Sequence, residues 1–134
     1  METKLDFSDV LIEPTPTEVE SRKLVDLEVT YRFAYSPLTL TCVPVMAANM
    51  DTVGTLEVMK VLAEYNMFTC LHKFITVEEF ALEQDFLKTH LDNFAITIGY
   101  SDSEIERLRE IQSIVDFKAI CIDYLSSYSF MFPF

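Results

Sequence analysis

The chain has 134 residues, a length sufficient to bury one sizeable core. Half of its residues are apolar, a larger share than is typical of a disordered protein. Its 22 acidic and 10 basic side chains leave a net charge of −12, which disfavours nucleic-acid and anionic membrane surfaces. No apolar run approaches the ~20 residues of a membrane helix, and the N-terminus lacks an apolar signal core. We therefore expect a soluble, cytoplasmic protein with no nucleic-acid or membrane partner.

The first elements in chain order are extended. Residues 5–12 (LDFSDVLI) are typical of an apolar strand or hairpin arm that stops before Pro14. Residues 25–33 alternate well enough for a second extended piece. The run VPVMAANM at 43–50 has small apolar residues and no helical period, which favours a fully buried strand.

Helices and strands are then predicted to alternate. Further elements are a helix over 55–65, a strand over 67–72, a helix from Thr76, a strand over 93–99, a helix from Ser101 and a strand over 117–123. Two capping boxes mark helix starts, at Thr76 with Glu79 and at Ser101 with Glu104. Each helix has a predicted apolar face, comprising Val58, Val61, Leu62 and Tyr65 in the first, Val77, Phe80, Ala81 and Leu87 in the second, and Ile105, Leu108, Ile111 and Val115 in the third.

This βαβαβαβ order predicts an α/β fold with a parallel sheet, because continuous apolar strands covered by amphipathic helices occur in such sheets. The pattern of strands is compatible with both a doubly wound sheet and a barrel. The only two glycines are Gly54 and Gly99, and no Gly-rich loop follows the first buried strand. A Rossmann dinucleotide-binding motif is therefore excluded.

The three cysteines are widely spaced, and each lies in or beside an apolar run. Cys42, Cys70 and Cys121 show no Cys-x-x-Cys or Cys/His ligand spacing. We interpret them as buried reduced thiols, with a nucleophile or a metal ligand as the alternative. No metal site is predicted.

Several separated motifs resemble GMP reductase, a member of the IMP dehydrogenase/GMP reductase family. They occur in the family's order from Lys4 to Asp123 and are KLDFSDVLI near the start, Ser21-Arg22, AANMDTVGT at 47–55, His72-Lys73 and the CID of residues 121–123. Asn49, Gly54 and the short step from the second helix to the third strand favour the reductase over the dehydrogenase. The family's members are (β/α)₈ barrels. The resemblance therefore implies the N-terminal half of a (β/α)₈ TIM barrel, with about four parallel strands and three helices, preceded by an extended N-terminal arm.

The resemblance implies a single partial barrel domain over residues 1–134. We divide it into an N-terminal arm (1–42), a half barrel (43–123) and a divergent aromatic tail (124–134). The tail departs from the family pattern, and we interpret it as a truncation or out-of-family terminus, with a hydrophobic docking peg as the alternative.

The resemblance also implies a cofactor and a ligand. Lys73 and Asp123 would contact NADPH, whereas Ser21 and Arg22 would contact NADPH bound to a neighbouring subunit. Met50 is similar to a residue that packs near the purine ligand, GMP or IMP. The alternatives are a solvated cation for Lys73, a helix N-cap for Asp123 and an ordinary core residue for Met50.

The family's catalytic groups lie in the other half of the barrel. A complete barrel needs roughly 250 residues and eight strands. No catalytic residue is therefore assigned in this chain. The resemblance implies NADPH-dependent reductive deamination of GMP to IMP, which we expect only when a C-terminal half completes the barrel. A homo-oligomer is a further possible assembly. The alternatives are a non-catalytic interaction partner of full-length reductase subunits and a degenerate fragment.

Overall fold

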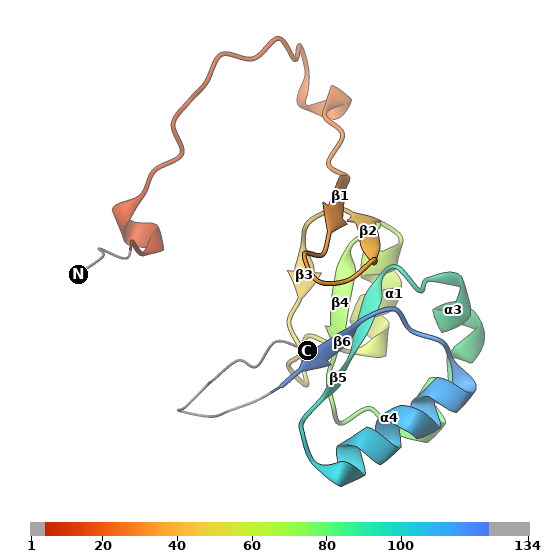
Figure 1. The fold of residues 1–134 in the computed structure, drawn as a ribbon. Coiled ribbons are helices and arrows are strands. Elements are labelled where there is room, and N and C mark those ends of the chain that lie inside the picture. Colours follow the sequence, from red (N-terminus) through yellow and green to blue (C-terminus); the bar gives the residue numbers. More distant parts are fainter. Residues whose placement is uncertain (1–4, 124–134) are drawn as a thin grey trace.

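A computed structural model describes residues 5–123 and shows an exposed N-terminal arm, a small hairpin and a four-stranded sheet with its helices (Figure 1). The arm holds two 3₁₀ turns, Phe7–Asp9 and Arg22–Leu24. The strand predicted over residues 5–12 is wrong. Leu11 and Ile12 are each 97% exposed, so within residues 5–123 this apolar run has no second strand or core to pack against.

The hairpin lies within the region predicted as the arm. It consists of β1 (Val29–Arg32) and β2 (Thr39–Cys42), which pair antiparallel. The extended piece predicted over residues 25–33 is thus confirmed for its second half. The arm and half-barrel boundaries of the sequence analysis stay a prediction.

The main sheet is parallel, with the strand order β3-β4-β5-β6. Its strands are β3 (Met46–Ala47), β4 (Phe68–Leu71), β5 (Phe94–Ile98) and β6 (Ile120–Ile122). The spatial order follows the chain order without the reversal that defines a doubly wound sheet. This order is that of a partial (β/α)₈ barrel.

The helices are α1 (Leu56–Ala63), α2 (Val77–Leu82), α3 (Gln84–Thr89) and α4 (Asp102–Ile114). Both bonds of the predicted capping box at the start of α2 are present: Thr76 Oγ1 accepts from Glu79 N at 3.2 Å, and a Glu79 carboxylate oxygen accepts from Thr76 N at 2.7 Å. The helix predicted from Thr76 is two helices, because Glu83 leaves the helical region (φ −103°, ψ 10°).

Each face of the sheet has its own core. On the helix side, β4 and β5 contribute the outward residues Leu71, Phe94, Ile96 and Ile98, which cluster with residues of the helices. On the other side, the inward residues Phe68, Cys70 and Ala95 cluster with Leu40 and Cys42 of the hairpin. The two clusters show that side chains on both faces of the sheet are buried.

The predicted face of the first helix is wrong for two of its four residues, since Val58 and Leu62 are half-buried but Val61 and Tyr65 are exposed. In α1 the buried residues are Leu56 and Met59, whereas Val61 and Tyr65 are 57% and 62% exposed. Apolar residues surround most of this helix, so their spacing in the sequence did not determine which side of the helix faces the core. Contact with β4 determined it instead.

The strand predicted over residues 43–50 is shorter and more exposed than expected. Only Met46 and Ala47 pair, and Val45 and Met46 are 51% and 59% exposed. Among the described strands, β3 has a neighbour on one side only, so half of its surface is uncovered. A fully buried strand needs neighbours and cover on all sides.

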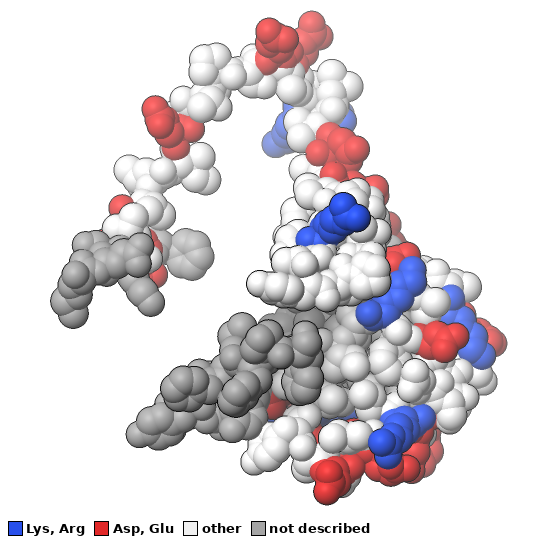
Figure 2. Space-filling view, in the orientation of Figure 1, with Lys and Arg blue, Asp and Glu red and all other residues white. Residues whose placement is uncertain are grey.

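Acidic side chains follow the arm and gather around α4 in the face shown in Figure 2. Of the helices that the structure describes, none is both long and apolar enough to cross a membrane.

Candidate functional site

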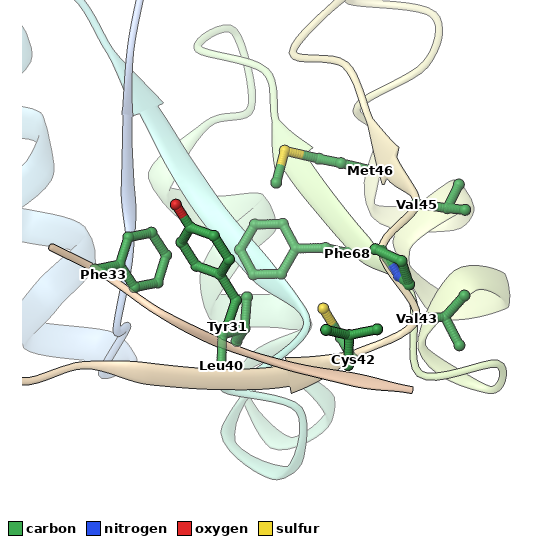
Figure 3. Close-up of a pocket in the computed structure, with 10 residues that line it drawn as sticks. Tyr31, Phe33, Leu40, Cys42, Val43, Val45, Met46 and Phe68 are labelled. Carbon is green, nitrogen blue, oxygen red and sulfur yellow. The ribbon is translucent and has the colours of Figure 1, made fainter. Parts of the chain in front are cut away.

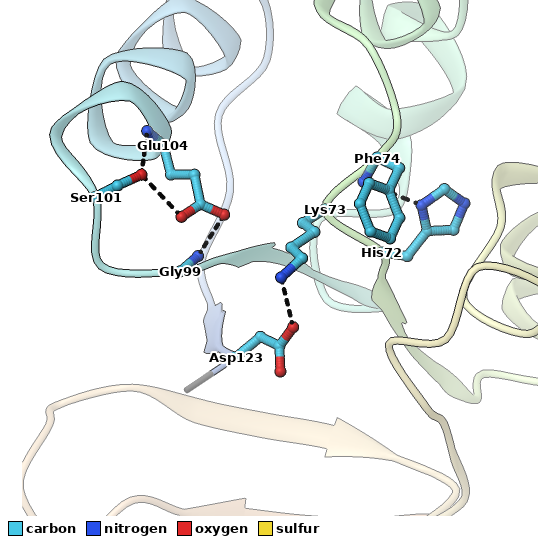
Figure 4. Close-up of polar contacts among 7 residues, drawn as sticks. All are labelled: His72, Lys73, Phe74, Gly99, Ser101, Glu104 and Asp123. Atoms are coloured by element: carbon cyan, nitrogen blue, oxygen red, sulfur yellow. Dashed lines mark hydrogen bonds and ion pairs between the residues drawn. The ribbon is translucent and has the colours of Figure 1, made fainter. Parts of the chain in front are cut away.

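The carboxyl ends of the parallel strands bring two predicted residues together. Lys73 follows β4 and Asp123 follows β6, and Lys73 Nζ lies 3.1 Å from Asp123 Oδ2 (Figure 4). The Asp123 N–H donates to Ile98 O at 2.8 Å, which extends the β5–β6 pairing and fixes the backbone that carries the carboxylate. The side chains of the pair are 35% and 32% exposed, so a ligand can reach both.

An exposed aromatic ring lies beside this ion pair. Phe74 is 67% exposed, and its ring centroid is 5.7 Å from Lys73 Nζ. Its N–H donates to His72 Nδ1 at 3.2 Å, which orients the imidazole away from the ion pair (Figure 4). The His72 N–H donates to Gly54 O at 2.9 Å. His72 therefore acts in this structure as a positioning residue for the loop after β4.

A carboxylate occupies the loop between β5 and α4. Ser101 Oγ caps the helix by accepting from Glu104 N, and the Glu104 carboxylate accepts from Gly99 N and from Ser101 Oγ, both at 3.0 Å. These bonds, chiefly the one from Gly99, hold the pKa of Glu104 below its ordinary value, and Lys73 lowers it further. The Glu104 carboxylate therefore ties the first turn of α4 back to the end of β5.

Gly54 ties the loop after β3 to the end of β4. The N–H groups of Val53 and Gly54 both donate to Met50 O, at 2.9 and 2.7 Å. A Cβ at position 54 would lie 2.1 Å from the Cys70 carbonyl oxygen and 2.7 Å from that of Ala48. Only glycine fits between these two backbones. Met50, 57% exposed at this loop, is not a core residue and is open to a ligand.

Ser21 and Arg22 belong to the exposed arm, which extends away from the four-stranded sheet in Figure 1. Ser21 Oγ accepts from Lys23 N at 3.3 Å and so caps the second 3₁₀ turn. The structure does not bring these two residues to Lys73 and Asp123 within one chain. Their predicted contact with a neighbouring subunit stays a prediction.

The cysteines are free thiols near the inner face. Cys42 and Cys70 are buried and Cys121 is half-buried. Burial, together with the neighbouring Cys121, raises the pKa of Cys70 to about 12, and burial raises that of Cys42. Thiols with raised pKa are poor nucleophiles at neutral pH. Over residues 5–123, no group of three or more His, Cys, Asp or Glu side chains is placed to hold a metal.

Comparison of the sequence with known proteins shows to which family the chain is related. GMP reductase 1 of Homo sapiens is 38% identical over 130 residues, which cover 94% of this chain and 37% of that protein. GMP reductase 2 of Homo sapiens is 40% identical (96% and 37% covered), and GMP reductase of Ascaris suum is 39% identical (98% and 38% covered). The chain belongs to the IMP dehydrogenase/GMP reductase family, as an N-terminal part.

The fold comparison agrees with this family. The crystal structure of inosine 5′ monophosphate dehydrogenase from Legionella pneumophila aligns with a TM-score of 0.63 and 29% identity, covering 88% of this chain and 34% of that chain. No family model matches the chain. The chain spans a little over a third of the length of the GMP reductases that it matches.

Two features of this site were not predicted. The capping pair Ser101–Glu104 was visible in the sequence, but the reach of Glu104 back to Gly99 was not, since it depends on the loop's backbone path. Phe74 adjoins His72-Lys73 in the sequence, and its exposure beside the ammonium group could be known only from the fold.

Proposed function

We propose that this chain provides the N-terminal part of an NADPH-dependent GMP reductase, and that it becomes active only with the remaining strands of the barrel. The observation that carries the proposal is the Lys73–Asp123 pair at the active end of the sheet. In (β/α)₈ enzymes, catalytic and binding residues come from the carboxyl ends of several strands. Similarity to the GMP reductases supports the choice of substrate and cofactor.

The residues at this end fit a dinucleotide. The Lys73 ammonium group is a cation for a phosphate, and the Asp123 carboxylate can accept hydrogen bonds from ribose hydroxyls or an amide. We propose that a bound cofactor replaces their mutual ion pair, which is half-exposed and therefore weak. The Phe74 ring lies close enough to Lys73 to cover one side of the same ligand. Met50, at the neighbouring loop, would pack against the purine of GMP or IMP.

In the proposed reaction NADPH supplies a hydride to the purine C2 and becomes NADP⁺, while the bond from C2 to the amino group breaks and that group takes up a proton from water and leaves as ammonia. The residues of this chain would bind and orient the two ligands. The catalytic groups would come from the other half of the barrel, from a companion polypeptide or a further segment. We place the activity in the cytoplasm, consistent with the free thiols.

The test mixes this chain with the C-terminal remainder of a GMP reductase and follows NADPH consumption that depends on GMP. We expect no turnover by the chain alone and measurable turnover by the mixture. Lys73→Ala should raise the KM for NADPH in the mixture by roughly 10–100-fold, because a charged hydrogen bond is worth about 1.5–3 kcal/mol. Lys60→Ala is the matched control, since Lys60 forms a similar ion pair with Glu83, at 2.6 Å, on the helices. Turnover by the chain alone, or equal KM values for the two variants, would refute the proposal.

A second candidate is a non-catalytic partner of full-length reductase subunits. It is favoured by the outer strand β6, where Ile120 and Ile122 are 45% and 66% exposed and could pair with another chain. Co-purification with an intact reductase, with a change in its activity, would support this candidate over the first.

A further inference from the structure

Three sulfur atoms gather on the inner face of the sheet. The Cys70 thiol of β4 donates to the Met46 thioether of β3, with the two sulfurs 3.4 Å apart. Cys121 of β6 packs against the cluster that contains Cys70, and it is close enough to help raise the pKa of the Cys70 thiol. The strands β3, β4 and β6 therefore each bring one sulfur atom to the same region.

A buried hydroxyl group without a partner adjoins these sulfurs. Thr97 of β5 is the register partner of Cys121, and it lies two residues after Ala95 of the inner-face cluster, so its side chain points to the same face. Thr97 is fully buried, and its Oγ1 has no hydrogen-bond partner among the described residues. A buried donor that lacks an acceptor is unfavourable. A negatively charged sulfur on this face would supply the acceptor.

The two cysteines are too far apart for a disulfide. Because β5 lies between β4 and β6, these strands are two spacings apart, about 9.6 Å at ~4.8 Å each. The Cα atoms of a disulfide are at most ~6.8 Å apart, so a bond between Cys70 and Cys121 would require the backbone to move. Two sulfurs that bind one metal ion at ~2.3 Å lie up to about 4.6 Å apart, compared with about 2 Å in a disulfide. An ion can therefore bridge a gap that a disulfide cannot.

The chemistry of the ligands selects the ion. Two thiols and a thioether are soft ligands, which favour Cu(I) over hard cations such as Mg²⁺ and Ca²⁺. Zinc sites of the structural type take four ligands, and within residues 5–123 no His, Asp or Glu joins the two cysteines. Cu(I) is satisfied by two or three sulfur ligands. Met46 is 59% exposed and lines an apolar pocket of about 290 Å³ (Figure 3), which gives an ion a route from solvent.

We propose that Cys70 and Cys121, with Met46 as a third ligand, bind one Cu(I) ion on the inner face of the sheet. Binding forms two copper–thiolate bonds, the two thiol protons leave to solvent, and copper stays in the Cu(I) state. The two thiolates and the ion together carry one excess negative charge, and the Thr97 hydroxyl stabilises it by donating a hydrogen bond to a thiolate. These residues all belong to the described part of the chain, whereas the predicted aromatic tail, residues 124–134, lies outside it.

An anaerobic titration of the whole chain with Cu(I) tests the proposal, with the coloured Cu(I) chelator bathocuproine disulfonate as the competitor. We expect one ion per chain, and X-ray absorption at the copper edge should show sulfur neighbours only. Cys70→Ser and Cys121→Ser should each abolish this one-to-one binding. Thr97→Val removes the hydroxyl at nearly constant volume and should weaken binding by roughly 10–100-fold, as for other groups that hydrogen-bond to metal ligands.

Cys42→Ser is the matched control, because this buried thiol belongs to the same cluster and is not one of the proposed ligands. It should leave the affinity for Cu(I) unchanged, with circular dichroism to show that each variant is folded. An equal loss of binding in Cys42→Ser and Cys121→Ser would overturn the proposal. So would nitrogen or oxygen neighbours at the copper, or no binding by the unmodified chain in the competition. X-ray absorption of the unmodified chain decides the question even where a cysteine variant fails to fold.

Discussion

Replacing Gly54 with alanine should destabilise the fold strongly, because the new Cβ would meet backbone atoms. It would lie 2.1 Å from the Cys70 carbonyl oxygen and 2.7 Å from that of Ala48, and neither atom can rotate away. Overpacking typically costs about 1–3 kcal/mol. Moving the loop also weakens the bond from His72 N to Gly54 O, worth about 1 kcal/mol. The expected loss in free energy of unfolding is therefore about 2–4 kcal/mol.

Urea unfolding followed by circular dichroism measures this loss. With a slope of about 1.5 kcal/mol per M, the midpoint should fall by about 2 M. Gly99→Ala is the matched control, since its Cβ would meet only the end of the flexible Glu104 side chain. That carboxylate can turn away at the cost of about one hydrogen bond. The reasoning is refuted if Gly54→Ala is no less stable than Gly99→Ala.

Three further predictions concern the core, the α4 loop and the thiols. Phe80→Ala should cost about 3–5 kcal/mol in urea unfolding, because this side chain is fully buried between the sheet and the helices. The lowered pKa of Glu104 means that its ionised form stabilises the fold above its ordinary pKa, and this contribution is lost as the pH falls through the folded-state value. Stability measured from pH 6 to pH 3 should therefore fall more steeply in the native chain than in Glu104→Gln, and equal slopes would contradict this account. Cys70, with a pKa of about 12, should react with iodoacetamide at pH 7.5 far more slowly than Cys121 in the folded chain, and at a similar rate in urea, as judged by mass spectrometry of peptides.

The buried strands and the helix starts could be predicted from the sequence. The runs that became β4 and β5 are continuously apolar, and all nine of their residues are buried, four in β4 and five in β5. The caps Thr76 and Ser101 use side-chain bonds to amides three residues away, so their geometry is contained in a few adjacent residues. These features are local, and they are confirmed for both strands, for the capping box at Thr76 and for the Ser101 cap. At Ser101 the second bond of the predicted capping box is not the one found, because the Glu104 carboxylate accepts from Gly99 N.

The failures share a different cause. The run at 5–12 is as apolar as a strand but has no neighbouring strand in the described chain. The side of α1 that is buried depends on the packing of this helix against β4. The break at Glu83 was not visible, because the apolar period of residues 77–87 continues across it. Pairing partners and packing surfaces are properties of the assembled fold, so local pattern could not supply them.

The candidate site divides in the same way. The sequence by itself determined which residues follow the strands, since Lys73, Gly99 and Asp123 come directly or almost directly after apolar runs. Only the tertiary structure decided that Lys73 and Asp123, fifty residues apart, form an ion pair, and that Glu104 reaches back to Gly99. The physical reason is that parallel pairing in the order β4-β5-β6 gathers the carboxyl ends of the strands at one edge. That order is set by long-range hydrogen bonds and burial, not by any short stretch of the chain.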